Sequence, residues 1–273
     1  VRPQLLGSDA HWLGENAALL ASLGAPAIDL NFGCPAKTVN RHRGGASLLR
    51  EPELLQQIVA SVRAATPASV PVTAKMRLGY SDTGLTLECA AALEAGGAAE
   101  ITVHARTKVE GYKPPAHWEW LARIRESVSV PVIANGDVWT PEDYRQIRDI
   151  SGCERVMIGR GLVRRPDLAR QIRQADCADT AMAPWPSLLP WIADFFQQTR
   201  ERVVDRHAPG RLKQWLSMLG LTYAEAKPLF DALRRETNAE SISRCLDALA
   251  AGADQAQTLL ALSEQKPIVQ SCA

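Results

Sequence analysis

The sequence carries almost no excess charge, because 31 Lys and Arg residues face 30 Asp and Glu residues and leave a net charge of +1. This balance excludes a polyanion-binding composition spread over the whole protein, so any surface for nucleic acid must be local. The six cysteines include no CxxC pair and no Cys/His cluster with zinc-site spacing. We therefore expect reduced thiols, as in a cytoplasmic protein, and no metal site.

Long apolar runs are also missing. The longest, around residues 17–30, is interrupted by Gly24 and Pro26 and falls short of the roughly 20 residues that span a membrane. No charged-then-apolar signal segment, tandem repeat or low-complexity tract is present. We expect a soluble cytoplasmic protein with no membrane partner. Because Val1 replaces an initiator Met and a strand-like segment follows at once, we also expect a missing N-terminus.

Short apolar runs recur along the first part of the sequence, each followed by helical periodicity. Helix starts are marked at Glu51-Pro52 and at Thr140-Pro141. The predicted strands are Pro3–Leu6, Ala27–Asn31, Val70–Leu78, Glu100–His104, Val130–Asn135 and Arg155–Gly159. This alternation predicts a parallel α/β sheet, either closed as a (β/α)8 TIM barrel or open and doubly wound.

Two observations favour the barrel. Polar, Gly-bearing clusters follow strand after strand, where a barrel gathers its active site. An open nucleotide-binding sheet would more often show a GxGxxG turn after its first strand, and none is present. The clusters are NFGCP, KMRLG, HARTK, ANGD and IGRG.

The βα rhythm stops near residue 175, so we expect a second, small all-helical domain. Residues 176–187 are rich in turn formers and are predicted to be a linker. The expected organisation is a partial TIM-barrel catalytic domain over residues 1–175, the linker, a helical domain over 188–262 and a tail over 263–273.

Cys34 is the first candidate for chemistry, because Gly33 and Pro35 place it on a turn at the predicted barrel mouth. A free cysteine is most often a small buried hydrophobe, and that alternative stays open at this point. The loop that follows is basic and Gly-bearing, with no acidic residue until Glu51. Such a loop suits a phosphodiester ligand, although a charge run alone is usually a solvated face.

Two further strands carry polar residues in their interior. Lys75 lies inside a predicted strand, where an unpaired charge is costly, so it needs an anion, or an acidic partner, or a route to solvent along its stem. His104 and Arg106 share one strand face, with apolar residues on the other. A histidine there is commonly a satisfied core residue, but the neighbouring clusters slightly favour a cofactor contact.

Glycines close the last two predicted strands, in Asn135-Gly136 and in Gly159-Arg160-Gly161. Barrels commonly bind phosphate at the loops after strands seven and eight through glycine amides. Glycine is also the default turn residue, so each motif alone is weak evidence.

Read together, these motifs resemble the tRNA-dihydrouridine synthase family, over Gln4 to about Ala169. The longest is LNFGCPAKTVNRHRGGASLL, and RLKQWLSML at Arg211–Leu219 resembles the RNA-binding helical domain of the bacterial C subfamily. The resemblance implies a TIM barrel in which reduced FMN, with NADPH as electron donor, gives hydride to carbon six of uracil. A cysteine then protonates carbon five from the opposite face, and Cys34 holds its place.

The resemblance also implies the remaining site residues, with the uridine at tRNA position 16 as the target. Contacts to FMN are implied for Gln4, Lys75, His104, Asn135, Gly136, Asp137, Gly159 and Arg160, where Asp137 stands in place of a frequent Glu. Contacts to tRNA are implied for Asn31, Tyr112, Lys113, Arg211 and Lys213. We expect a monomer.

One departure from the family is that its first two strands, with a PMxG-type turn under the flavin, have no counterpart before Val1. Two alternatives therefore remain: a catalytically inactive RNA-binding protein, and another FMN-dependent TIM-barrel reductase. The second would need neither the helical tail nor the basic loop.

Overall fold

The structure is a computed structural model that describes residues 1–174 and 181–264. The chain divides into two compact units, Val1–Ile158 and Gly159–Ala273. Each unit has its own buried apolar cluster. Within the described residues, none of the helices combines the length and the apolar character that crossing a membrane requires.

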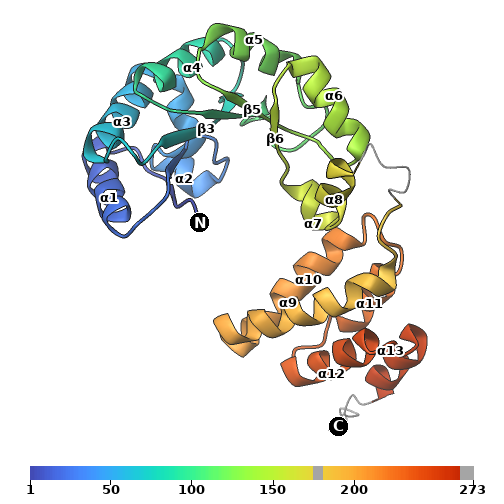
Figure 1. Cartoon of the computed structure of the whole chain (residues 1–273). Coiled ribbons are helices and arrows are strands. Elements are labelled where there is room, and N and C mark those ends of the chain that lie inside the picture. Colours follow the sequence, from blue (N-terminus) through green and yellow to red (C-terminus); the bar gives the residue numbers. More distant parts are fainter. Residues whose placement is uncertain (175–180, 265–273) are drawn as a thin grey trace, which may run out of the picture. The chain divides into compact units, whose positions relative to one another are not determined.

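The first unit alternates strands and helices along the chain (Figure 1). Its strands are β1 (Gln4–Leu5), β2 (Ile28–Asn31), β3 (Val72–Gly79), β4 (Ile101–Thr107), β5 (Val132–Asn135) and β6 (Arg155–Met157). Its helices are α1 (Ala10–Ser22), α2 (Lys37–Arg41), the short 3-10 helix η1 (Gly45–Arg50), α3 (Pro52–Ala65), α4 (Thr86–Ala95), α5 (Glu119–Ser127) and α6 (Pro141–Ser151). Every predicted strand overlaps an observed one.

The six strands form one parallel sheet in the order β1-β2-β3-β4-β5-β6. A doubly wound sheet reverses its strand order at a switch point, whereas a barrel adds each strand beside the previous one. Right-handed crossovers in this order place the helices on one side of the sheet, and Figure 1 shows α1, α3, α4, α5 and α6 around its outside. The predicted TIM-barrel fold class is confirmed.

Local sequence determines where the helices begin. Thr140 accepts a hydrogen bond from the Asp143 amide while the Asp143 carboxylate accepts one from the Thr140 amide, which is a complete capping box. Pro141 and Pro52 occupy the first positions of α6 and α3, where a missing N–H leaves no hydrogen bond unmade. Both predicted helix starts are confirmed.

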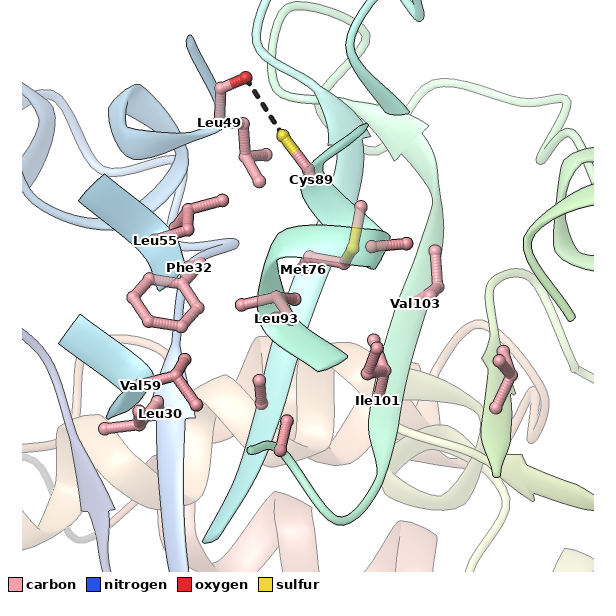
Figure 2. Packing of buried hydrophobic residues seen from close by; sticks show 14 of the residues in the cluster. Leu30, Phe32, Leu49, Leu55, Val59, Met76, Cys89, Leu93, Ile101 and Val103 are labelled. Carbon is pink, nitrogen blue, oxygen red and sulfur yellow. Dashed lines mark hydrogen bonds between the residues drawn. The ribbon is translucent and has the colours of Figure 1, made fainter. Parts of the chain in front are cut away.

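The core lies between the sheet and the outer helices. Buried apolar residues of the strands, such as Leu30, Met76 and Val103, pack with residues of the outer helices, such as Leu55, Val59 and Leu93 (Figure 2). They are almost fully buried, and burying such a side chain contributes about 1.5–3 kcal/mol. The Cys89 thiol donates to the Leu49 carbonyl at 3.3 Å, and burial raises the pKa of this thiol to about 12, so Cys89 is a core residue.

The amino-terminal ends of the strands meet at Glu100, which directly precedes β4 and is buried. Its carboxylate binds Arg2, just before β1, at 3.2 Å and Arg155, the first residue of β6, at 2.5 Å. β1 and β6 are the two edges of the sheet. One carboxylate therefore contacts residues from both edges.

The second unit is helical and includes residues expected in the barrel. Its helices are α7 (Arg160–Arg164), α8 (Leu168–Arg173), the 3-10 helices η2 (Trp185–Leu188) and η3 (Asp205–His207), α9 (Leu189–Arg202), α10 (Ala208–Leu219), α11 (Ala226–Leu233), α12 (Ala239–Ala250) and α13 (Gln255–Glu264). Asp167 accepts from the Ala183 amide at 2.8 Å and from the Tyr223 hydroxyl at 3.4 Å. These contacts join Asp167, which was expected in the barrel domain, to the helical unit.

The expected linker and tail are described only in part. Residues 175–180 and 265–273 lie outside the described residues. Of the expected linker, Ala183 and Trp185 are buried in the helical core, so its last part packs with the helical unit.

Candidate active site at the carboxyl ends of the strands

The sheet face opposite the core is polar. On β3 the side chains of Thr73, Lys75 and Arg77 alternate with apolar ones, and the pairing register sets Lys75 opposite Asn31 and Arg77 opposite His104. The polar residues that share this face include Asp29, Asn31, Thr73, Lys75, Arg77, Thr102, His104, Arg106 and Asn135. The structure therefore places Asn31, Lys75, His104 and Asn135 on one face of the sheet.

Cys34 follows β2 on a turn that several hydrogen bonds hold in place. Its carbonyl accepts from the Ala46 amide at 3.1 Å and from the Asn40 side chain at 2.8 Å. The Asn31 side chain accepts from the Gly33 amide at 3.0 Å. Among the cysteines that the structure describes, Cys34 alone is not buried. Its thiol is thus the one available for chemistry in the described residues.

Gly45 makes the Cys34 turn possible. Its φ of 60° is in the left-handed region, and a Cβ there would lie 2.8 Å from the Cys34 carbonyl oxygen and 2.9 Å from its Cβ. Only a glycine fits such an approach to backbone without strain. The basic loop after Cys34 is exposed at Lys37, Arg41 and Arg43, and Arg43 pairs with Glu51 at 2.6 Å.

Gln4 and Asn31 are directly hydrogen-bonded to each other. The Asn31 amide group donates to Gln4 Oε1 at 2.9 Å, and Gln4 Nε2 donates to the Asp29 carboxylate at 2.6 Å. Asp29 also accepts from the Thr73 hydroxyl at 2.6 Å. Both amide side chains are thereby oriented at the edge of the sheet.

Lys75 is half-buried and has an unusual electrostatic environment. Its ammonium donates to Asn135 Oδ1 at 3.2 Å, and Asn135 Nδ2 donates to the Met157 carbonyl at 2.8 Å. Burial, with a smaller contribution from the charge of Arg77, lowers the pKa of Lys75 from 10.5 to about 8, although the charge of Asp29 opposes the change. An anion placed beside this ammonium would raise its pKa, because an opposite charge favours the ionised form.

The turn after β5 carries Gly136 and Asp137, both at positive φ. A Cβ on Gly136 would lie 3.1 Å from Ala116 Cβ and 3.5 Å from His104 Cδ2. The Asp137 carboxylate forms a two-pronged ion pair with the fully buried Arg106, whose Nε also donates to the Pro115 carbonyl at 3.2 Å. Trp118 Nε1 donates to the Gly136 carbonyl at 2.9 Å.

The loop after β4 carries Tyr112 and Lys113, which are exposed. The Tyr112 ring lies 6.0 Å from the His104 ring and 5.2 Å from the Arg77 guanidinium carbon. The Glu110 carboxylate folds the loop by accepting from the Thr107 amide at 2.6 Å and from His117 Nε2 at 2.8 Å. Burial opposes these hydrogen bonds, but together they lower the pKa of Glu110.

Arg77 is the main residue that the sequence interpretation left without a role. It is buried, and its guanidinium donates to the carbonyls of Gly33, Thr107 and Gly111 at 2.9, 3.1 and 2.9 Å. Burial lowers the pKa of Arg77, and Tyr112 opposes that change. Its spacing of two residues from Lys75 was the available signal, since alternate strand residues share a face.

The remaining predicted residues lie in the second unit. Gly159 caps α7 and Arg160 is its first residue. Arg211 is exposed on α10 beside a pocket of about 430 Å³ that Phe195, Trp215 and Met218 also line. Lys213 donates to the Glu236 carbonyl at 2.6 Å, and burial lowers the pKa of Lys213.

A family model for dihydrouridine synthase (Dus) matches residues 1–244 of this chain. The chain therefore belongs to the dihydrouridine synthase family, as its motifs predicted. Its similar relatives include the tRNA-dihydrouridine(16) synthase of Pseudomonas putida, 59% identical over 90% of this chain and 76% of that protein. Proteins of the same name from Ralstonia nicotianae and Neisseria meningitidis serogroup A are 55% and 53% identical, over 85% and 90% of this chain and 71% and 74% of theirs.

Proposed function

We propose that this protein is an FMN-dependent tRNA-dihydrouridine synthase that reduces the uridine at position 16 in the D loop of tRNA. The family match and relatives that carry this name support the reaction and the position. The observation that carries the proposal at the site is that a cysteine that is not buried and a half-buried lysine lie at neighbouring strands of the same sheet. Cys34 follows β2, and Lys75 lies on the same polar sheet face as the Asn31 that holds its turn.

The reaction adds a hydride and a proton across the carbon five–carbon six double bond of uracil. Reduced FMN, regenerated by NADPH, supplies the hydride to carbon six when bound. Cys34 supplies the proton to carbon five: its S–H bond breaks, a C–H bond forms, and solvent later returns a proton to the thiolate. A neutral thiol carries the proton that a general acid must give, whereas a nucleophile would have to be a thiolate.

The residues of the polar face fit an anionic, planar cofactor. The Lys75 ammonium, with its pKa near 8, has a carboxamide as hydrogen-bond acceptor and would be stabilised by a negatively charged ring edge. Asn135 would orient that ammonium, and Gly136 would admit the cofactor where a Cβ is absent. We assign His104, Asp137 and Gln4 to the same cofactor, and Gly159 and Arg160 to its phosphate.

The tRNA contacts are assigned to residues around Cys34 and on the helical unit. Tyr112 is 52% exposed and offers a ring on which an extruded base can stack, which would offset part of an unstacking cost of a few kcal/mol. Lys113 and Arg211 are exposed cations for phosphates. Asn31 would form hydrogen bonds with the uracil base. Its hydrogen bond to Gln4 would connect this base-binding residue to a cofactor-binding residue. Lys213 is included, although its ammonium already has a carbonyl partner.

The test is complementation of a strain that lacks its own position-16 synthase. Wild type should restore dihydrouridine at position 16, measured by mass spectrometry of tRNA fragments, and Cys34→Ala should not. Cys245→Ala is the matched control, because that cysteine is buried in the helical core. Equal restoration by Cys34→Ala would remove Cys34 from the mechanism, and dihydrouridine at another position would overturn the assigned target.

Purified wild-type protein should in addition be yellow from bound FMN. A colourless preparation that binds tRNA without modifying it would instead support an inactive RNA-binding protein.

A further inference from the structure

Arg77 joins two loops that come from different strands. Its Nε donates to the carbonyl of Gly33, directly before Cys34, and its Nη1 donates to the carbonyl of Gly111, directly before Tyr112. A further bond from Nη1 reaches the Thr107 carbonyl at the start of the second loop. A single planar guanidinium therefore holds the residues preceding both Cys34 and Tyr112.

Burying the Arg77 guanidinium opposes folding, because the charge loses its hydration. Arg77 is 1% exposed, and within the described residues no carboxylate forms an ion pair with it. Backbone carbonyls and the face of the Tyr112 ring compensate the charge instead. Buried charges are normally paired, so a cation satisfied by loop carbonyls indicates that the loops need to be fixed.

Lysine could not replace this group. The guanidinium has five N–H donors in a rigid plane and uses them here in two directions, whereas an ammonium is a compact point charge on a flexible stem. The Tyr112 ring also stacks with a planar cation more favourably than with an ammonium.

We propose that Arg77 is a positioning residue that fixes the Cys34 thiol for proton transfer and links its position to tRNA contact at the Tyr112 loop. The proposal rests on the function proposed above. When tRNA contacts Tyr112 and Lys113, movement of their loop is transmitted through Gly111, the guanidinium and Gly33 to the Cys34 turn. Proton donation then becomes competent only when the substrate is in place.

Arg63 provides a matched control. Its guanidinium also donates to three backbone carbonyls, those of Thr66, Pro67 and Val70, but in the loop that precedes β3. Arg77→Lys and Arg63→Lys thus remove the same kind of interaction at opposite ends of one strand.

The experiment compares wild type, Arg77→Lys, Arg77→Gln and Arg63→Lys in two assays. The first is the rate of iodoacetamide alkylation of Cys34, resolved by peptide mass spectrometry, with and without saturating tRNA. Without tRNA, Cys34 should be alkylated at least ~3-fold faster in the Arg77 variants than in wild type, because the Cys34 turn opens locally. Saturating tRNA should change the alkylation rate of Cys34 in wild type but not in these variants. Arg63→Lys should behave as wild type.

The second assay separates the two half-reactions. Arg77→Lys should retain FMN and should reduce it with NADPH at the wild-type rate. Oxidation of the reduced FMN by saturating tRNA should slow ~10- to 100-fold with little change in the KM for tRNA, as expected when the proton donor Cys34 is misplaced. The proposal would be overturned if both Arg77 variants showed the Cys34 alkylation rate and the tRNA-dependent rate of FMN oxidation of the wild type. If wild type itself forms no dihydrouridine, the proposed function fails, while the tRNA-free alkylation rates still decide whether Arg77 positions Cys34.

Tyr112→Ala tests the link if the Arg77 variants do not fold, because Tyr112 is half-exposed and dispensable for the core. Without tRNA, alkylation of Cys34 should stay closer to wild type than in the Arg77 variants, because the bonds from Arg77 to the Gly33, Thr107 and Gly111 carbonyls remain while its contact with the Tyr112 side chain is lost. Saturating tRNA should no longer change the alkylation rate of Cys34 in this variant. A change as large as in wild type would overturn the proposed link between the Tyr112 loop and the Cys34 turn.

Discussion

Gly45 and Cys34 approach each other so closely that no side chain can stand at position 45. A Cβ would lie 2.8 Å from the Cys34 carbonyl oxygen, and the φ of 60° adds strain for any other residue. This contact sets the turn on which the proposed proton donor sits. The identity of residue 45 therefore bears on chemistry although Gly45 carries no functional group.

Gly45→Ala should displace the Cys34 turn and lower the free energy of unfolding by about 1–3 kcal/mol, the usual cost of a strained backbone position. Gly24→Ala is the control, because Gly24 also has a positive φ (84°) but no heavy atom near a Cβ. Urea unfolding and dihydrouridine formation should both fall further in Gly45→Ala than in Gly24→Ala. Equal effects would mean that the contact with Cys34 is unimportant.

The lowered pKa of Lys75 predicts a specific pH dependence of stability. Between about pH 8 and 10.5 the unfolded chain holds the Lys75 proton and the flavin-free folded protein does not. The free energy of unfolding of wild type relative to Lys75→Met should therefore rise with pH across this window, by at most about 3 kcal/mol. Below pH 8 both states are protonated and the difference should be constant.

Lys75→Arg is the control for this pH series, since arginine remains charged throughout the window. The difference in the free energy of unfolding between Lys75→Arg and Lys75→Met, measured by urea titration of flavin-free protein, should be independent of pH. Parallel curves for wild type and Lys75→Met would contradict the lowered pKa.

Removing the carboxylate of Asp137, the ion-pair partner of Arg106, should destabilise the folded protein. Asp137→Asn leaves a fully buried guanidinium without its carboxylate, so we expect a loss of about 3 kcal/mol in the free energy of unfolding. Glu51→Gln breaks the exposed pair with Arg43 and should change it by less than ~1 kcal/mol. Thermal unfolding of both variants provides the comparison, and similar small losses would show that Arg106 is satisfied by other partners.

Trp118 should matter for the turn after β5 through its indole N–H. Trp118→Phe keeps most of the apolar contact but removes the hydrogen bond to the Gly136 carbonyl, a loss of about 1 kcal/mol. FMN retention should fall with it, measured by flavin absorbance after gel filtration. Trp120→Phe, which alters another half-buried tryptophan packed on the same core, should retain FMN as wild type does.

Strands β3 and β4 could be predicted because their signal is local. Alternation of apolar and polar residues determines which side chains share a face, and it placed His104 and Arg106 correctly on the polar one. The polar, Gly-bearing clusters after successive strands and the absence of a GxGxxG turn then favoured the barrel over an open sheet. The cap at Thr140 is equally local, since all its partners lie within three residues.

Arg77 and the unit boundary could not be predicted because their partners are remote. The carbonyls that Arg77 binds are 30 to 44 residues away in sequence, so its spacing from Lys75 could indicate the sheet face of Arg77 but not its partners. In the same way, the sequence placed Asp167 within the expected barrel domain over residues 1–175, but its bonds to Ala183 and Tyr223 attach it to the helical unit. Polar interactions of this kind depend on which backbone groups folding brings together.

The contacts of Glu100 give the first unit a mechanical property. Because its carboxylate binds Arg2 before β1 and Arg155 on β6, it acts as a tie across the base of a curved sheet. Such a tie limits how far the two outer strands can spread. The curvature that brings Gln4 and Asn135 to the same polar face is thus governed from the end of the strands that takes no part in the chemistry.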